Sequence, residues 1–124
     1  MNSLQIPPTD LTPHVLLNAN EGKFTFIGKS YPENVNDFYG EIINYITLYA
    51  QNPIEKTTLE FNWLYFNTAS YKTIVKIISL LKGVQEKGKT LEIRWQCKAN
   101  DDLMLEKGEE LKELLNVNFS IVHV

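Results

Sequence analysis

The sequence predicts a single α/β domain, residues 1–124, with a mixed, mostly parallel β-sheet, an N-terminal β-hairpin and about three helices. Two observations support this fold class. Segments with apolar residues at alternate positions are separated by segments with apolar residues at helical spacing, in the order β-β-α-β-α-β-α-β. Because strands joined by a helical crossover run parallel with right-handed connections, everything after the first two strands is expected to form a parallel sheet.

The chain begins with a segment that we expect to be an extended arm, residues 1–13. It contains three prolines, which cannot donate backbone hydrogen bonds, so the arm should pair at most with a sheet edge. Val15–Leu17 and Phe24–Gly28 are apolar runs that flank a loop of turn-forming residues, 18–22. This pattern predicts a β-hairpin with a longer connection.

The next segment predicts a helix capped by Asn34 and ending near Gln51–Pro53. Its apolar residues recur at helical spacing: Phe38, Ile42, Tyr45, Ile46 and Tyr49. Leu59–Phe66 alternates as a strand does, and its polar side becomes apolar toward the C-terminal end. We therefore expect this strand at the centre of the sheet, covered on both faces.

The second predicted helix runs from about Ala69 or Ser70 to Glu86, and Gly88 is a suitable terminator. Leu91–Cys97 alternates as a half-buried strand. Asn100, Asp101 and Asp102 then open a third helix through Leu115, and the β-branched run 117–124 predicts a last strand.

Composition argues against several classes of protein. A net charge of −3 does not suggest a nucleic-acid surface. One cysteine cannot form an internal disulfide, and Cys97 on the apolar side of its strand should be buried. The two histidines lack metal-ligand spacing, and no apolar stretch has the length of a membrane span, so we expect a cytoplasmic protein. No phosphate-binding loop, dinucleotide motif or nucleophile elbow is present, so we expect neither a cofactor nor an enzyme.

The junction between the central strand and the second helix is the strongest candidate for a site. It places Thr68 at a helix start, where a phosphate would be held favourably by about 0.3–1 kcal/mol. Lys72, one helical turn later, is within reach of such a phosphate. We interpret Thr68 as a switch. The alternative is a structural subunit in which Thr68 only caps the helix, because threonine is also a common N-cap residue.

A second hypothesis concerns the acidic residues at the start of the third helix. Asp101, Asp102 and Glu106 supply the oxygen ligands that hard cations prefer. They leave open a small metal-binding or ligand-binding domain, or a small enzyme that uses magnesium.

Five short motifs resemble those of the SiaC-like bacterial regulatory phosphoproteins, over nearly the whole chain. They are Thr12-Pro13, Gly28 to Asn34 with Phe38-Tyr39, Tyr65 to Thr68, Trp95, and Asp101-Asp102 with Glu106 to Glu109. The resemblance implies a fold similar to the STAS domains of anti-sigma-factor antagonists.

The same resemblance implies a partner-switching function in signal transduction. Thr68 takes the place of the threonine phosphorylated by a dedicated serine/threonine kinase and restored by a PP2C-type phosphatase. The unphosphorylated form is expected to bind a diguanylate cyclase and promote cyclic di-GMP synthesis, which regulates biofilm formation. We expect the partner-binding residues to be Ser30, Tyr31, Pro32, Glu33, Asn34, Asn67, Ser70 and Lys72.

Overall fold

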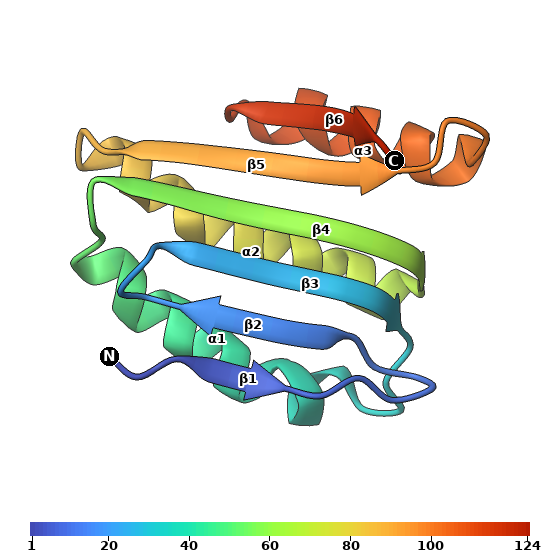
Figure 1. The fold of residues 1–124 in the computed structure, drawn as a ribbon, viewed down its shortest axis with the longest axis horizontal. Helices are drawn as coiled ribbons and strands as arrows, with labels where there is room; N and C mark the ends of the chain where they lie inside the picture. The colour runs from blue at the N-terminus through green and yellow to red at the C-terminus, as the bar shows by residue number, and fades with distance from the viewer.

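Six strands and three helices make up the computed structural model, which describes residues 1–124 (Figure 1). The elements are β1 (Leu4–Ile6), β2 (His14–Asn18), β3 (Lys23–Ser30), α1 (Val35–Gln51), β4 (Lys56–Phe66), α2 (Thr68–Glu86), β5 (Thr90–Cys97), α3 (Asp102–Leu115) and β6 (Phe119–His123). The strands lie in the sheet in chain order, β1 to β6. β1 to β3 are antiparallel and β3 to β6 are parallel, which confirms the predicted mixed sheet.

The predicted hairpin is present as β2 and β3, paired from His14 opposite Ile27 to Asn18 opposite Lys23. β1 is an additional strand that the sequence pattern did not predict as such. It lies within the N-terminal arm and pairs with β2, with Leu4 opposite Leu17. The arm therefore folds back along the edge of the sheet.

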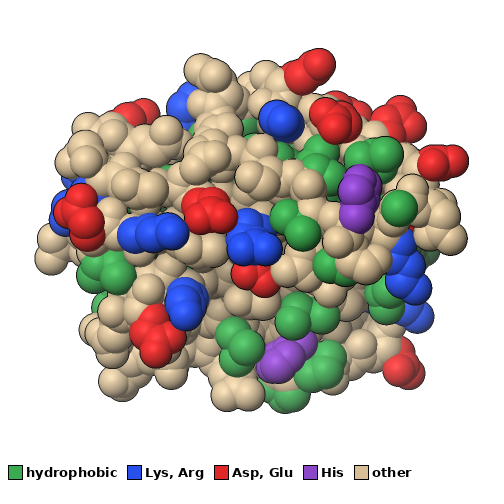
Figure 2. Space-filling view, turned by 45° about the horizontal axis from the view of Figure 1, so that its top comes forward, with side chains coloured by type: hydrophobic (Ala, Val, Ile, Leu, Met, Phe, Trp, Pro, Cys, Tyr) green, Lys and Arg blue, Asp and Glu red, His purple; other side chains and the backbone are tan.

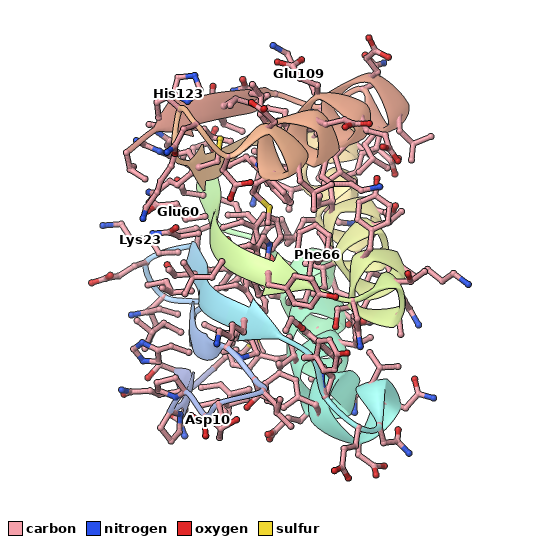
Figure 3. The ribbon with its side chains drawn as sticks, turned by 90° about the vertical axis from the view of Figure 1, so that its right-hand side faces the viewer. Asp10, Lys23, Glu60, Phe66, Glu109 and His123 are labelled. Atoms are coloured by element: carbon pink, nitrogen blue, oxygen red, sulfur yellow. The ribbon has the colours of Figure 1, made fainter.

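All three helices lie on one face of the sheet, as Figures 1 and 3 both show. The expectation that β4 is covered on both faces was therefore wrong. On the other face, which we call the open face, Glu60 Oε1 accepts a hydrogen bond of 2.7 Å from Gln96 Nε2, and Leu64 is 62% exposed. Acidic and basic side chains alternate over this face (Figure 2). Leu64, one of the side chains that made the C-terminal end of β4 look apolar on both faces, is exposed on the open face, and no second layer covers it.

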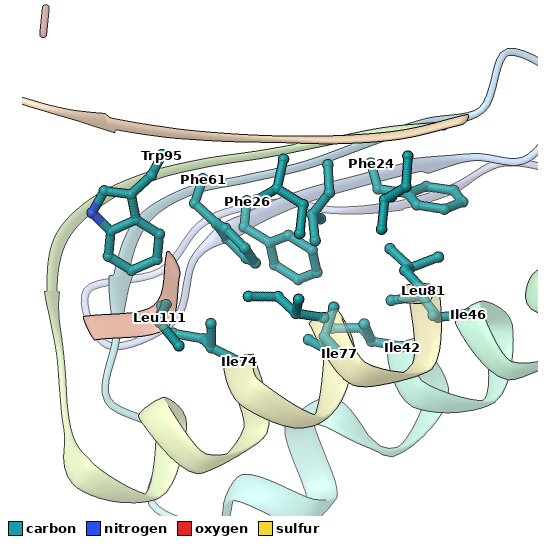
Figure 4. Packing of buried hydrophobic residues seen from close by; sticks show 14 of the residues in the cluster. Phe24, Phe26, Ile42, Ile46, Phe61, Ile74, Ile77, Leu81, Trp95 and Leu111 are labelled. Atoms are coloured by element: carbon teal, nitrogen blue, oxygen red, sulfur yellow. The ribbon is translucent and has the colours of Figure 1, made fainter. Parts of the chain in front are cut away.

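The core fills the space between the sheet and the helices (Figure 4). Aromatic rings from three strands face aliphatic side chains of the helices: Phe24, Phe26, Phe61 and Trp95 against Ile42, Ile46, Ile74, Ile77, Leu81 and Leu111. Burial of this apolar surface is the main favourable contribution to folding. None of the helices combines the length and apolarity needed to cross a bilayer.

The helix ends follow the predicted signals closely. Asn34 caps α1, its side chain accepting hydrogen bonds of 3.1 Å from the backbone N–H groups of Asn36 and Asp37. After α2, Gly88 has φ +77° and donates to Gln85 O, while Lys89 N–H donates to Val84 O. These paired bonds form a Schellman motif, which confirms Gly88 as the terminator.

Candidate functional site

The carboxyl ends of β3 and β4 meet at one edge of the sheet, where Ser30 is opposite Phe66 (Figure 3). The backbone N–H of Asn67 donates a 3.1 Å hydrogen bond to Ser30 O, which ties the two strand exits together. Residues 30–34 and 67–70, far apart in the sequence, are thus neighbours. Sites in open α/β sheets commonly lie at this edge.

Thr68 is the first residue of α2 and is exposed. The N-cap is Asn67, whose Oδ1 accepts a 2.9 Å hydrogen bond from Ser70 N–H. The alternative in which Thr68 itself caps the helix was therefore wrong. The capping bond is supplied one residue earlier, and the helix starts one or two residues before the predicted position. The hydroxyl of Thr68 is left for solvent or for modification.

Ser30 and Ser70 lie beneath this surface in a buried hydroxyl network. The Ser30 hydroxyl donates to Ser70 Oγ at 2.8 Å and shares a 2.6 Å hydrogen bond with Tyr39 Oη. Both serines are fully buried, so the expectation that their side chains contact a partner needs correction. They position the two strand exits instead. Burial raises the pKa of Tyr39 to about 12, with the Ser30 hydrogen bond opposing it, so the network stays neutral near pH 7.

An exposed pair of aromatic rings lies beside the strand exits. Tyr31 and Tyr65 are 47% and 44% exposed, and their ring centroids are 5.4 Å apart. Together with Asp10, Leu11 and Lys29 they line a hollow of about 380 Å³, which we call the tyrosine hollow. Tyr65 was not predicted as a contact residue, because its alternation with Trp63 suggested burial. The register of β3 and β4 shifts between Gly28 and Lys29, so Leu64 is an extra residue in β4 and Tyr65 lies opposite the exposed Lys29.

The other predicted contact residues differ in accessibility. Glu33 and Asn34 are exposed, whereas Pro32 is half-buried. Asn34 uses its side chain to cap α1, so it also holds the start of that helix. Segment 31–34 therefore offers Tyr31 and Glu33 as its least constrained exposed side chains.

Thr68 opens onto a second, smaller hollow of about 120 Å³, which we call the threonine hollow. It is lined by Phe66, Asn67, Thr68, Tyr71 and Lys107. The rings of Phe66 and Tyr71 stack with centroids 5.8 Å apart. Lys72 is exposed and does not line this hollow. The cationic group of the threonine hollow is that of Lys107, which belongs to α3. The spacing of residues along the chain could not reveal this contact.

Lys107 is held in place by two groups. Its Nζ lies 5.0 Å from the centroid of the Tyr71 ring and 3.6 Å from Glu110 Oε2. Tyr71 Oη donates a 3.0 Å hydrogen bond to Glu110 Oε1. Burial, and then the Glu110 carboxylate, raise the pKa of Tyr71 to about 12, so the phenol remains a donor.

The acidic residues proposed as metal ligands are not brought together. Asp101 Oδ1 accepts a 3.1 Å hydrogen bond from Met104 N–H and caps α3. Asp102 and Glu106 are exposed, and no three His, Cys, Asp or Glu side chains are placed to hold a metal ion. The hypothesis of a magnesium site is corrected accordingly. Cys97 is buried as predicted, and burial and Asp101 raise the pKa of its thiol, the opposite of an activated thiolate.

Comparisons with known proteins agree on one family. The model of the SiaC family regulatory phosphoproteins matches residues 6–124. An uncharacterised protein of Pseudomonas aeruginosa strain UCBPP-PA14 is 31% identical, over 98% of this chain and 96% of its own length. The structure is similar to SiaC of Pseudomonas aeruginosa, with a TM-score of 0.86 and 27% identity over 100% of this chain and 98% of that one. A crystal structure of the diguanylate cyclase SiaD in complex with its activator SiaC, also from Pseudomonas aeruginosa, matches with a TM-score of 0.91 and 28% identity over 98% and 99% of the two chains.

Proposed function

The chain belongs to the SiaC family of regulatory phosphoproteins, and on this basis we propose that it is a non-enzymatic adaptor that activates a diguanylate cyclase while Thr68 is unphosphorylated. The observation that carries the proposal is the position of Thr68. It is exposed at the start of α2, its hydroxyl takes no part in capping, and the tyrosine hollow lies at the same sheet edge. The relative in complex with SiaD is described as an activator of that cyclase, which supports the choice of partner.

Phosphate on Thr68 acts by charge. It adds about −1.5 to −2 at pH 7 to a surface that otherwise offers aromatic rings, neutral polar groups and the charged side chains of Asp10, Lys29 and Lys107. The N-terminus of α2 carries a partial positive charge, so the modification is tolerated by the fold. A partner that packs on Tyr31 and Tyr65 would have to desolvate this charge. Phosphorylation therefore weakens partner binding and leaves the fold intact.

The same proposal includes the two enzymes that add the phosphate to Thr68 and remove it. A serine/threonine kinase transfers the γ-phosphoryl group of a nucleoside triphosphate to Thr68 Oγ1, which loses its proton. A PP2C-type phosphatase hydrolyses the ester with water and restores the hydroxyl. In the bacterial cytoplasm, this cycle would set the amount of active cyclase, and through cyclic di-GMP it would regulate biofilm formation.

Partner binding is tested with phosphothreonine incorporated at position 68 during synthesis of the full chain. We expect the phosphorylated protein to bind the diguanylate cyclase of the same genome at least about tenfold more weakly than the unmodified protein, a difference of about 1.4 kcal/mol. Isothermal titration calorimetry gives the affinity, and cyclic di-GMP production gives the activation. Thr68→Val is the control that removes the hydroxyl without adding charge. Equal affinity of the phosphorylated and unmodified proteins would refute the switch.

The contact surface is tested separately. Exposed tyrosines at the centre of an interface often contribute more than 1 kcal/mol, so Tyr31→Ala and Tyr65→Ala should each weaken cyclase binding by about fivefold or more. Leu48→Ala is the matched control, because Leu48 is 58% exposed on α1 and does not line the tyrosine hollow. Loss of affinity in Leu48→Ala with none in the tyrosine variants would place the interface elsewhere.

A further inference from the structure

The threonine hollow contains a cation that no capping or core role explains. Lys107 Nζ belongs to α3, yet its side chain lines the same hollow as Thr68. We propose that Lys107 is the residue that pairs with a phosphate on Thr68, and that it leaves Glu110 to do so. This inference rests on the proposed function, since it concerns the phosphorylated state of the same site.

The present contacts of Lys107 are weak enough to be exchanged. Its ion pair with Glu110 is 3.6 Å long, and the two side chains are 33% and 48% exposed. Pairs of this kind contribute about 0–1 kcal/mol, because water screens them and both side chains lose freedom. A phosphate offers nearly twice the charge of a carboxylate and three strong acceptor oxygens. The ammonium group therefore gains by moving from Glu110 to Thr68.

Two features keep Lys107 within reach of Thr68. The adjacent Gly108 packs against Trp95, where a Cβ would lie 2.7 Å from Trp95 Cδ1, so α3 approaches the sheet closely. Trp95 Nε1 also donates a 3.0 Å hydrogen bond to Met104 O, one turn earlier in α3. The Lys107 side chain then places its Nζ over the Tyr71 ring, 5.0 Å from the centroid, at the lining of the hollow.

The exchange connects phosphorylation to α3. When Lys107 moves, the Glu110 carboxylate loses its cation and keeps only the hydrogen bond from Tyr71. The start of α2 and the middle of α3 are then joined by a phosphate-ammonium pair across the ring of Tyr71. A partner that touches α3 would thus meet a different arrangement of charges in the two states.

A ³¹P NMR titration of the phosphate measures this pairing directly. The phosphothreonine is incorporated at position 68 of the full chain by genetic encoding, so no kinase is needed. An ammonium group beside the phosphate favours the dianion and lowers its second pKa, which is ordinarily near 6. We expect Lys107→Met to raise the titration midpoint by about 0.5 pH unit or more relative to the unsubstituted phosphoprotein. Lys107→Arg, which retains the charge, should restore the low midpoint.

Two further variants complete the design. Lys72→Met is the matched control, because Lys72 is on α2 one turn from Thr68 but does not line the hollow; its midpoint should move less than half as far. Glu110→Gln removes the competing carboxylate and should lower the midpoint. Equal midpoints for the unsubstituted and Lys107→Met phosphoproteins, or a larger shift in Lys72→Met, would overturn the proposal.

The titration separates this inference from the proposed function. If the cyclase binds both forms equally while Lys107→Met still shifts the midpoint, the switch fails and the pairing stands. If binding depends on phosphate while the midpoint is indifferent to Lys107, the pairing fails and the switch stands.

Discussion

Asn67 and Thr68 are adjacent at the start of α2 but contribute to different properties. Asn67 holds the helix start, through the bond from Ser70 N–H to its Oδ1 and the bond from its own N–H to Ser30 O. Thr68 is exposed, and its side chain is not part of the capping arrangement. Asn67 thus stabilises the start of the helix, and the side chain of Thr68 is available for modification.

Asn67→Ala should lower the free energy of unfolding by about 1 kcal/mol, because the Ser70 N–H loses its acceptor. Thr68→Ala should change it by less than about 0.5 kcal/mol, as expected for an exposed position without a structural partner. Urea denaturation followed by tryptophan fluorescence measures both. A larger loss in Thr68→Ala than in Asn67→Ala would return the capping role to Thr68.

Tyr39 makes stability depend on pH in the alkaline range. Its pKa is about 12 in the folded protein and near 10 when unfolded, so the folded state favours the neutral phenol. The associated stability is fully present below pH 10 and is lost as the pH rises toward 12. This difference in pKa corresponds to about 3 kcal/mol of unfolding free energy. In Tyr39→Phe, the fall in unfolding free energy between pH 9.5 and 11.5 should therefore be shallower.

The control for Tyr39 is Tyr31→Phe, which alters an exposed tyrosine. This variant should follow the unsubstituted protein through the same pH range. Identical alkaline profiles for the unsubstituted protein and Tyr39→Phe would show that ionisation of Tyr39 is not linked to unfolding.

At the scale of elements, α3 depends on a close approach to the sheet. Gly108 lacks the Cβ that would lie 2.8 Å from Trp95 Nε1, so it permits the contact that places Lys107 beside Tyr71. Trp95 cannot easily retreat, because it is fully buried and bonded to Met104 O. The close approach of α3 to the sheet therefore depends on the missing Cβ of Gly108 and on the fixed position of Trp95.

Gly108→Ala should destabilise the protein by about 1–3 kcal/mol, because overpacking against Trp95 outweighs the better helix propensity of alanine. Gly83→Ala in α2 is the matched control. An added Cβ there meets nothing within 4 Å, so it should stabilise by about 0.5–1 kcal/mol. Thermal unfolding of the two variants measures both changes in stability. Stabilisation by both substitutions would show that α3 can shift away from Trp95 without cost.

Element positions and caps were largely predictable, because they depend on local signals. The helical spacing of Ile42 and Ile46, the cap at Asn34 and the terminator Gly88 depend only on near neighbours in the chain. The predictions that failed concern contacts between elements, which local sequence patterns do not report. The pattern of β4 did not reveal that one face is open, and nothing near Thr68 in the sequence indicates that Lys107 lines its hollow.

At the scale of the whole molecule, the N-terminal arm is part of the sheet. β1 pairs with β2, and Tyr45 Oη links the arm to the loop between β2 and β3 by donating to Asn2 O and accepting from Ala19 N–H. Leu4 and Ile6 are half-buried against the core. We therefore propose that the arm unfolds together with the rest of a single domain.

Replacing residues 1–7 by a single Met should lower the unfolding free energy by about 1–3 kcal/mol, through lost apolar contact and lost strand pairing. Amide hydrogen exchange in β2 should accelerate. Gln5→Ala, at an exposed position of β1, should leave both quantities unchanged. Unaltered stability after truncation would mean that the arm is an independent appendage.

The strand order has a consequence for synthesis. Because the sheet is ordered as the chain is, from β1 to β6, every strand pairs with the strand made just before it. No strand has to be inserted between two that are already paired. A nascent chain leaving the ribosome can therefore add each strand to a waiting edge, and in the folded sheet only the outer edges of β1 and β6 have no neighbouring strand.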